Sequence, residues 1–362
     1  MEFTMKTNLF PNLPARLFCG LTFFGFLMLS ALAGLAQKSE PYYVKSLDGL
    51  NIREAELITS GGSLQVYSIA GEKHRLEVYI TGNNGKDLAK AEIENRLKEK
   101  YELIIEASAD RIQAIAKQKS NWTDWKNSLN ISFKLYVPSK INSDLKTSGG
   151  SITLKGLDGN HDFATSGGSL NIENMKGDIE GKTSGGSITV KGAEGNVELK
   201  TSGGSISASD CKGEIELSTS GGSLKLVNLN GKIEASTSGG SISGENISGE
   251  LETKTSGGSI RLAKLSGSVE ASTSGGGMDV SIIDLGSYVK LRNSAGSINL
   301  SLPGGKGMSL DLQGNRVNVP ALSNFSGSAS NSELKGTMNG GGALVSAKSS
   351  AGNINLSFAN VQ

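Results

Sequence analysis

The chain has 362 residues, and 36 lysines and arginines against 35 aspartates and glutamates give it a formal net charge of +1. This balance argues against a nucleic-acid binder or a polybasic membrane-surface protein, which would carry a surplus of basic residues. Two histidines and two cysteines leave few ligands for zinc or iron–sulfur chemistry. Glycine is enriched, with 49 residues, about twice its ordinary share. Apolar residues still make up 36% of the chain, enough to build a core.

The first 36 residues have the pattern of a secretory signal. Lys6 and Arg16 precede the uncharged apolar stretch 17–36, which ends in Gly34, Leu35 and Ala36. We therefore expect cleavage before Gln37. The alternative is an uncleaved membrane anchor, because about 20 apolar residues can span a bilayer. Cleavage would remove Cys19 and leave Cys211 without a partner for an intrachain disulfide.

A tetrad of Thr-Ser-Gly-Gly recurs every 18 residues and dominates the sequence. It begins at Thr147, Thr165, Thr183, Thr201, Thr219, Thr237, Thr255 and Thr273. We number each unit from this threonine as place one. Places six, eight, fifteen and seventeen are mostly apolar, and place thirteen is glycine from Gly159 to Gly267. Such alternation is typical of strands with one buried face, and the glycines mark turns.

The repeat predicts an all-β fold, a single-chain parallel β-solenoid (β-helix) with 18-residue rungs. Eighteen residues are too few for a propeller blade, and a period of two does not fit helical repeats. In a solenoid, identical places of successive units stack about 4.8 Å apart. We therefore expect Ile188 to lie next to Ile206, and threonine at place one to point inward and bond from rung to rung.

The flanks depart from the repeat. We expect residues 1–36 to be the signal peptide, 37–146 to form N-terminal rungs and a capping insertion, 147–292 to form the regular solenoid, and 293–362 to form irregular coils and a closing strand. Within the cap, 59–64 is a stray copy of the unit, 87–100 predicts one short amphipathic helix, and 101–106 and 131–137 predict strands. Solenoids need caps because a terminal rung is an unpaired edge.

Three features resemble a bacterial envelope family of β-strand-repeat proteins, an adhesin-like domain of unknown function. They are the segment ISFKLYVPSKINSDLKTSGGSI at 131–152, the recurrent TSGGSI, and SAGNINL at 350–356. The resemblance covers most of the chain after residue 36. It implies an envelope location and a parallel β-solenoid. It implies no known reaction and supplies no catalytic residue.

Place sixteen carries a carboxylate in every regular unit, until Lys290 interrupts the series. The residues are Asp144, Asp162, Glu180, Glu198, Glu216, Glu234, Glu252 and Glu270. Stacked at 4.8 Å, neighbours repel by about 0.9 kcal/mol in bulk water. We favour a solvated face relieved by lysines at place eighteen, namely Lys146, Lys182, Lys200 and Lys254. The alternative is a cation-binding ridge, because calcium favours carboxylate oxygens.

The remaining candidates do not form a catalytic constellation, so we predict no catalytic, cofactor-binding or metal-binding residues. Aromatic residues are 5% of the chain, whereas sugar-cleaving solenoids usually need aromatic platforms beside an acid and a base. Trp122 and Trp125 could stack on sugars, but cap packing explains them better. His74 and His161 suggest no dyad, and Cys211 occupies an inward apolar place. Serine and threonine at places five and seven only weakly resemble an ice-binding array.

We therefore predict an exported, non-enzymatic β-solenoid of the cell envelope, structural or adhesin-like, in the periplasm, on the outer-membrane surface or outside the cell. Its partners would be glycans or envelope proteins, which it would bind through a repeated polar surface. We expect no cofactor, no nucleic-acid partner and no membrane span in the mature chain. Two alternatives stay open. One is a carbohydrate-active enzyme with carboxylates and a base in a groove formed by 80–129. The other is a periplasmic scaffold or sensor.

Overall fold

The computed structural model describes residues 40–71, 73–119 and 125–359, of which Pro41 onward belong to one compact unit. The predicted signal segment 1–36 lies outside the described residues, as does Trp122. The described part consists of strands apart from one α-helix, α2 (Lys90–Lys100), and two short 3-10 turns, η1 (Asn83–Gly85) and η2 (Trp125–Asn127). The predicted all-β solenoid with one short helix is confirmed, although the helix begins at Lys90.

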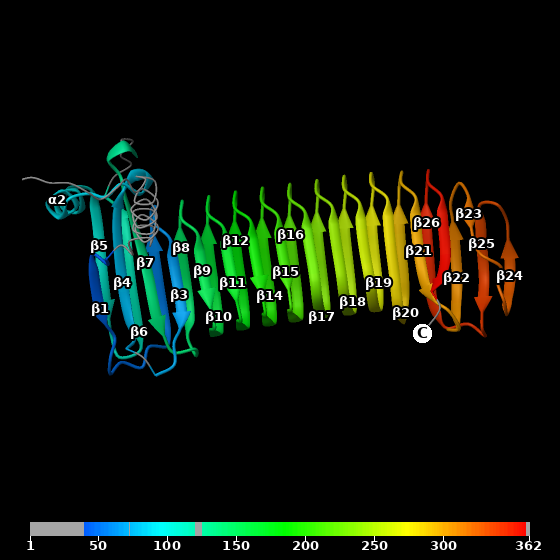
Figure 1. Ribbon diagram of the computed structural model, residues 1–362, viewed down its shortest axis with the longest axis horizontal. Helices are drawn as coiled ribbons and strands as arrows, with labels where there is room; N and C mark the ends of the chain where they lie inside the picture. Colours follow the sequence, from blue (N-terminus) through cyan, green and yellow to red (C-terminus); the bar gives the residue numbers. More distant parts are fainter. Residues whose placement is uncertain (1–39, 72, 120–124, 360–362) are drawn as a thin grey trace, which may run out of the picture. The chain divides into compact units, whose positions relative to one another are not determined.

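Each regular unit forms one rung with two sides. In the Thr183 unit, β13 (Ile188–Lys191) spans places six to nine, which we call the short side, and β14 (Glu194–Thr201) spans place twelve to the next threonine, which we call the long side. Figure 1 shows these strands repeating side by side from β8 to β20. The other short-side strands are β9 (Ile152–Lys155), β11 (Leu170–Glu173) and β15 (Ile206–Ser209). The other long-side strands are β8 (Asn142–Thr147), β10 (Asp158–Thr165), β12 (Lys176–Thr183) and β16 (Lys212–Thr219).

From Leu224 onward the two sides of a rung join in one bent strand. These strands are β17 (Leu224–Thr237), β18 (Ile242–Thr255), β19 (Ile260–Thr273) and β20 (Met278–Asn293). Neighbouring rungs pair in parallel with an offset of one unit, so that Ile188 is opposite Ile206 and Leu199 is opposite Leu217. The predicted stacking of identical places is therefore confirmed.

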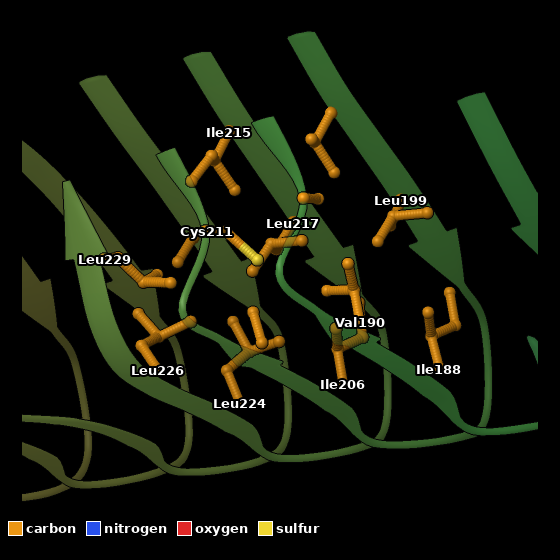
Figure 2. Packing of buried hydrophobic residues seen from close by; sticks show 14 of the residues in the cluster. Ile188, Val190, Leu199, Ile206, Cys211, Ile215, Leu217, Leu224, Leu226 and Leu229 are labelled. Atoms are coloured by element: carbon orange, nitrogen blue, oxygen red, sulfur yellow. The ribbon is translucent and has the colours of Figure 1, made fainter. Parts of the chain in front are cut away.

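The core lies between the two sides of the rungs. Figure 2 shows Ile188 and Val190 of the short side beside Leu199 of the long side, with the same arrangement in the next rungs. These side chains are at most 1% exposed, and each such residue contributes about 1.5–3 kcal/mol by leaving water. Volumes are balanced between rungs as well. Phe163 occupies the space beside Gly181, where an added Cβ would lie 2.4 Å from the ring.

The Thr-Ser-Gly-Gly tetrad forms the turn from the long side to the short side. Thr201 Oγ1 donates a 2.8 Å hydrogen bond to the carbonyl oxygen of Gly186 in the preceding rung and accepts one from the amide of Gly204 at 3.3 Å. A Cβ on Gly204 would lie 2.0 Å from the same carbonyl oxygen. The threonine column thus bonds from rung to rung as predicted. Its acceptors, however, are glycine carbonyls and not neighbouring hydroxyls.

Place ten turns the short side back into the long side through a left-handed residue. Gly192 has φ +69°, and Asn228 and Asn246 have φ of 54° and 55°. Glycine and asparagine adopt this conformation at little cost. Lys264, with φ 56°, is the unfavourable exception.

The N-terminal rungs are not stacked in chain order. The stray copy forms β2 (Glu54–Thr59) and β3 (Leu64–Ser68), which pair with β8 and β9 so that Thr59 is opposite Thr147. The insertion supplies the next rung outward, β6 (Arg111–Gln118) on β2 and β7 (Leu129–Val137) on β3. Antiparallel strands then finish this end: β4 (Arg75–Gly82) on β7, β1 (Tyr43–Ser46) on β4, and β5 (Tyr101–Ala107) on β6. The strands predicted at 101–106 and 131–137 correspond to β5 and β7.

The C-terminal end also departs from chain order. After β21 (Ile298–Pro303) the chain forms β22 (Met308–Gln313), β23 (Val317–Asn318), β24 (Phe325–Ala329) and β25 (Glu333–Met338). The last strands, β26 (Ala343–Ser349) and β27 (Ile354–Ala359), then return to an inner position. There β26 pairs with β20 and β22, and β27 pairs with β21 and β23. Antiparallel β24 and β25 lie outside them.

Candidate functional site

The carboxylates at place sixteen stack on the outward surface of the long side, as the repeat predicted. Successive members of the series are opposite one another in the strand register, from Asp144 to Glu270, and Lys290 follows Glu270. The structure adds Glu56, which is opposite Asp144 on β2. We call the series from Glu56 to Glu270 the acidic column.

Lysines neutralise much of the acidic column. Lys146 Nζ lies 2.9 Å from Asp144, Lys182 pairs with Glu180, and Lys200 lies 2.6 Å from Glu198 and 2.9 Å from Glu216. The hydrogen bonds that Lys200 donates to these two carboxylates raise the pKa of Lys200 to about 12, and Lys200 lowers the pKa of Glu198. These pairs support the interpretation as a solvated face. They are half exposed, so each contributes little to the stability of the fold.

Place eighteen does not supply every partner. At Glu234 the cation is Lys232, which lies 3.1 Å away at place fourteen, whereas at Glu270 it is Arg292 at 2.6 Å, which is opposite Ser272 of place eighteen. Lys254 forms no ion pair with a described residue. Among residues 40–71, 73–119 and 125–359, no group of three or more His, Cys, Asp or Glu side chains has the arrangement of a metal site. The cation-ridge hypothesis thus gains no ligand set.

A groove of about 610 Å³ follows the N-terminal part of the acidic column, and we call it the acidic groove. Its carboxylates are Glu54, Glu56, Asp144, Asp162, Asp178, Glu180 and Glu198, and its basic residue is Arg111 from the insertion. Arg111 and Gln113 each donate a 2.6 Å hydrogen bond to Glu56. These contacts lower the pKa of Glu56, the hydrogen bond from Gln113 being the largest cause. Glu56 is therefore ionised at neutral pH.

Aromatic residues gather on the outward surface of β3, β4 and β7, in what we call the tyrosine cluster. The rings of Tyr67 and Tyr136 stack with centroids 5.7 Å apart, and the Arg75 guanidinium lies 4.0 Å from the centre of the Tyr136 ring. Tyr79 donates a 2.7 Å hydrogen bond to Glu77. Burial and this bond raise the pKa of Tyr79 to about 12. Sequence reasoning missed the cluster, because its members meet only through the parallel pairing of β3 with β7 and the antiparallel pairing of β4 with β7.

The buried polar residues do not form an active site. His161 Nδ1 lies 2.8 Å from Ser143 Oγ, as in a nucleophile–base pair. His161 is 2% exposed, however, and its Nε2 has no partner to orient it. Burial lowers the pKa of His161 to about 4 and raises the pKa of the Cys211 thiol. Cys211 is therefore an inert core residue, as predicted.

The sequence matches one family along nearly its whole described length. The profile of the Toastrack DUF4097 family matches residues 38–357. The chain belongs to this family. The resemblance stated from residues 131–152, the TSGGSI units and the closing SAGNINL is therefore confirmed, and the β-solenoid is the Toastrack fold. A search of curated proteins found no match.

Three solved structures are similar to this Toastrack chain. A candidate adhesin from Bacteroides fragilis NCTC 9343 has 12% identity and a TM-score of 0.35, over 69% of this chain and 96% of the other. A candidate cell adhesion protein from Clostridium sporogenes ATCC 15579 has 12% identity and a TM-score of 0.17, over 88% and 100%. A candidate lipid-binding protein from Parabacteroides distasonis ATCC 8503 has 18% identity and a TM-score of 0.32, over 73% and 97%. None of the helices in the described ranges has the length and apolar character of a membrane span.

Proposed function

We propose that this Toastrack protein is an exported, non-enzymatic solenoid of the cell envelope with a structural or adhesive role. The observation that carries the proposal is the stacking of like outward side chains from rung to rung, of which the acidic column is one series. A surface that repeats one group at every rung permits many weak contacts with a partner that is itself repetitive. The N-terminal sequence, with an apolar stretch before Gln37, supports export.

Two features support a binding role over catalysis. The interior of the rungs is filled with apolar side chains, so reactive groups such as Ser143 and His161 are shielded from solvent. Outside, Lys200 pairs with Glu198 and Glu216 and lowers the pKa of Glu198, whereas glycoside cleavage needs one carboxyl group held protonated.

Location and binding test this proposal together. Intact cells are treated with a membrane-impermeant biotin reagent, and the amino terminus of the recovered protein is sequenced. We expect labelling and a terminus at Gln37. The purified protein is then screened against immobilised glycans and matrix proteins, and we expect retention on at least one class. A protein that stays in the cytosol with its first 36 residues would contradict export, and a blank screen would contradict the adhesive role and leave the structural one.

One observation favours a second candidate, a carbohydrate-active enzyme. In the acidic groove, carboxylates from five rungs, on β2, β8, β10, β12 and β14, converge with Arg111, which comes from the insertion. This arrangement is the one expected of a sugar-cleaving site next to residues 80–129. The test is release of reducing ends or unsaturated products from polysaccharides by the wild type and by Glu56→Gln and Asp144→Asn. Activity that both substitutions abolish would establish this candidate. Equal, background-level release would leave the binding role.

A further inference from the structure

A second groove, of about 630 Å³, crosses the short side on the C-terminal half of the solenoid. It is lined by places seven, eight and nine of six rungs adjacent in space, from β17 with Lys225 and Val227 to β27 with Asn355 and Ser357. We call it the short-side groove. Six rungs at about 4.8 Å per step give a length of roughly 24 Å between the outer strands.

Place nine carries only short side chains in the last four rungs of the groove. In the first rungs of the repeat this place carries Lys155, Glu173 and Lys191. Within the groove it carries Val227 and Glu245, and then the short residues Ala263, Ser281, Ser301 and Ser357. Since place nine points outward, short side chains there leave a trough that long charged ones would fill.

Place seven forms a ladder of side-chain hydrogen bonds in the last three rungs of the groove, on β20, β21 and β27, and onward to β23. Asn299 Nδ2 donates to Asp279 Oδ1 at 2.6 Å, and Asn355 Nδ2 donates to Asn299 Oδ1 at 2.7 Å. Asn318 on β23 donates to Asn355 at 2.7 Å. Each ladder bond uses one of the two N–H groups of an amide, so a second donor per asparagine is held in a fixed direction. Such preorganised donors bind a ligand with little further loss of conformational freedom.

The charges of the groove cancel. Lys225 and Arg261 are matched by Glu245 and Asp279, two against two. Arg261 lies 3.6 Å from Asp279, and Glu245 lies 2.7 Å from Lys264. A charged ligand therefore gains no net attraction. The amide ladder and the serines of place nine instead suit a ligand that carries many hydroxyl groups and no charge.

The groove continues into a hollow of about 650 Å³ at the C-terminal end, which shares Asn355, Leu356 and Ser357 with it. This hollow also has Val319, Pro320 and Phe358 in its lining. Apolar and aromatic walls beside hydrogen-bonding groups suit sugar rings, which have apolar C–H faces and polar edges.

We propose that the short-side groove binds a neutral polysaccharide chain laid along the solenoid axis, with sugar hydroxyls on the Asn299–Asn355 ladder and the serines of place nine. This inference deepens the proposed binding role by naming the ligand class and its place. It is independent of the acidic column, which lies on the other side of the rungs.

The test compares two tyrosine substitutions at the same place. Ser301→Tyr fills the groove, whereas Ser209→Tyr puts the same ring at place nine outside it. Binding of cellohexaose, mannohexaose and maltohexaose to the purified protein is measured by calorimetry at millimolar sugar. We expect wild type and Ser209→Tyr to bind at least one of them alike, and Ser301→Tyr to bind at least tenfold more weakly. Asn299→Ala, which removes one amide from the ladder, should weaken binding several-fold and guards against misfolding of the tyrosine variant.

Two results would overturn the groove assignment. One is binding that Ser301→Tyr and Asn299→Ala, both folded by circular dichroism, leave unchanged. The other is no binding of any neutral hexasaccharide, including the case in which oligogalacturonate alone binds. Failure of the proposed cell-surface role can be told apart from failure of the groove assignment. A protein that is confined to the cytosol but still binds a neutral hexasaccharide in this groove would contradict export and support the groove assignment.

Discussion

Thr201 Oγ1 donates a 2.8 Å hydrogen bond to the carbonyl oxygen of Gly186, one rung earlier in the stack. The same contact joins Thr183 to Gly168 and Thr219 to Gly204. Each of these glycines also packs its Cα face against the equivalent glycine of the neighbouring rung. The first and fourth residues of the tetrad are therefore fixed by contacts between rungs, which explains why both recur in all eight regular units.

The two glycines of one tetrad should differ sharply in their tolerance of a methyl group. A Cβ on Gly204 would lie 2.0 Å from Gly186 O, whereas on Gly203 the nearest atom would be 3.5 Å away. We expect Gly204→Ala to lower the free energy of unfolding by at least about 3 kcal/mol. Gly203→Ala should change it by no more than about 0.5 kcal/mol. Urea denaturation of both variants checks this. Equal losses would show that the rungs are not packed this closely.

Replacing each of two buried threonines with valine should change the stability of the fold in opposite directions. Thr237 donates to Gly222 O and accepts from Gly240 N, so Thr237→Val should cost about 1–3 kcal/mol. Thr253 is 1% exposed, lies between Ala235 and Ala271, and its hydroxyl has no partner. Thr253→Val should raise stability by about 1 kcal/mol. Thermal unfolding of the pair decides the point, and a destabilised Thr253→Val would mean that its hydroxyl is bonded.

Replacing Lys264 with asparagine should stabilise the fold. It adopts φ 56° at place ten, where Asn228 and Asn246 have the same conformation. Lys264→Asn should raise the free energy of unfolding by about 0.5–1 kcal/mol, since its half-exposed ion pair with Glu245 contributes little. The reverse change, Asn228→Lys, should cost about 1 kcal/mol or more, because it also removes a 2.8 Å bond to Asp210. Stability that falls in both variants would contradict the backbone argument.

His161 should make the fold sensitive to mild acid. Burial lowers its pKa from 6.5 to about 4, with Asp158 opposing the shift. Between these values the unfolded chain binds a proton that the folded chain does not, so stability is lost as the pH falls from 6.5 towards 4. The full difference is about 3 kcal/mol. His161→Leu should remove this part of the pH dependence, measured as the difference between the two denaturation series from pH 7.5 to 4. Identical slopes in both proteins would refute the assignment.

The periodic part of the chain could be predicted because the same 18-residue sequence pattern makes the same contacts in every rung. The inward places, the acidic column and the pairs at Lys146, Lys182 and Lys200 all follow from an offset of 18 residues. Glu56, however, was not among the predicted carboxylates. Its tetrad at Thr59 matches the unit, but only the pairing of β2 with β8 shows that the rung is contiguous with the repeat.

The ends could not be predicted in this way. Alternation shows that a segment is a strand but not which strand lies beside it. Nothing local indicates that β26 and β27 return between earlier strands, or that β4 pairs antiparallel with β7. The tyrosine cluster and the C-terminal half of the short-side groove depend on these long-range pairings. The groove also depends on the short residues at place nine. They are visible in the sequence, but they form a groove only because stacking places them side by side.

Distances along the stack test the central claim most directly. Spin labels at Thr153 and Lys225, four rungs apart at place seven, should lie about 19 Å apart. Labels at Thr153 and Asp279, seven rungs apart, should lie about 34 Å apart. Pulsed electron paramagnetic resonance measures both pairs in the intact protein. We predict that the separation grows in proportion to the number of rungs. A Thr153–Asp279 distance no greater than the Thr153–Lys225 distance would contradict the stacked solenoid.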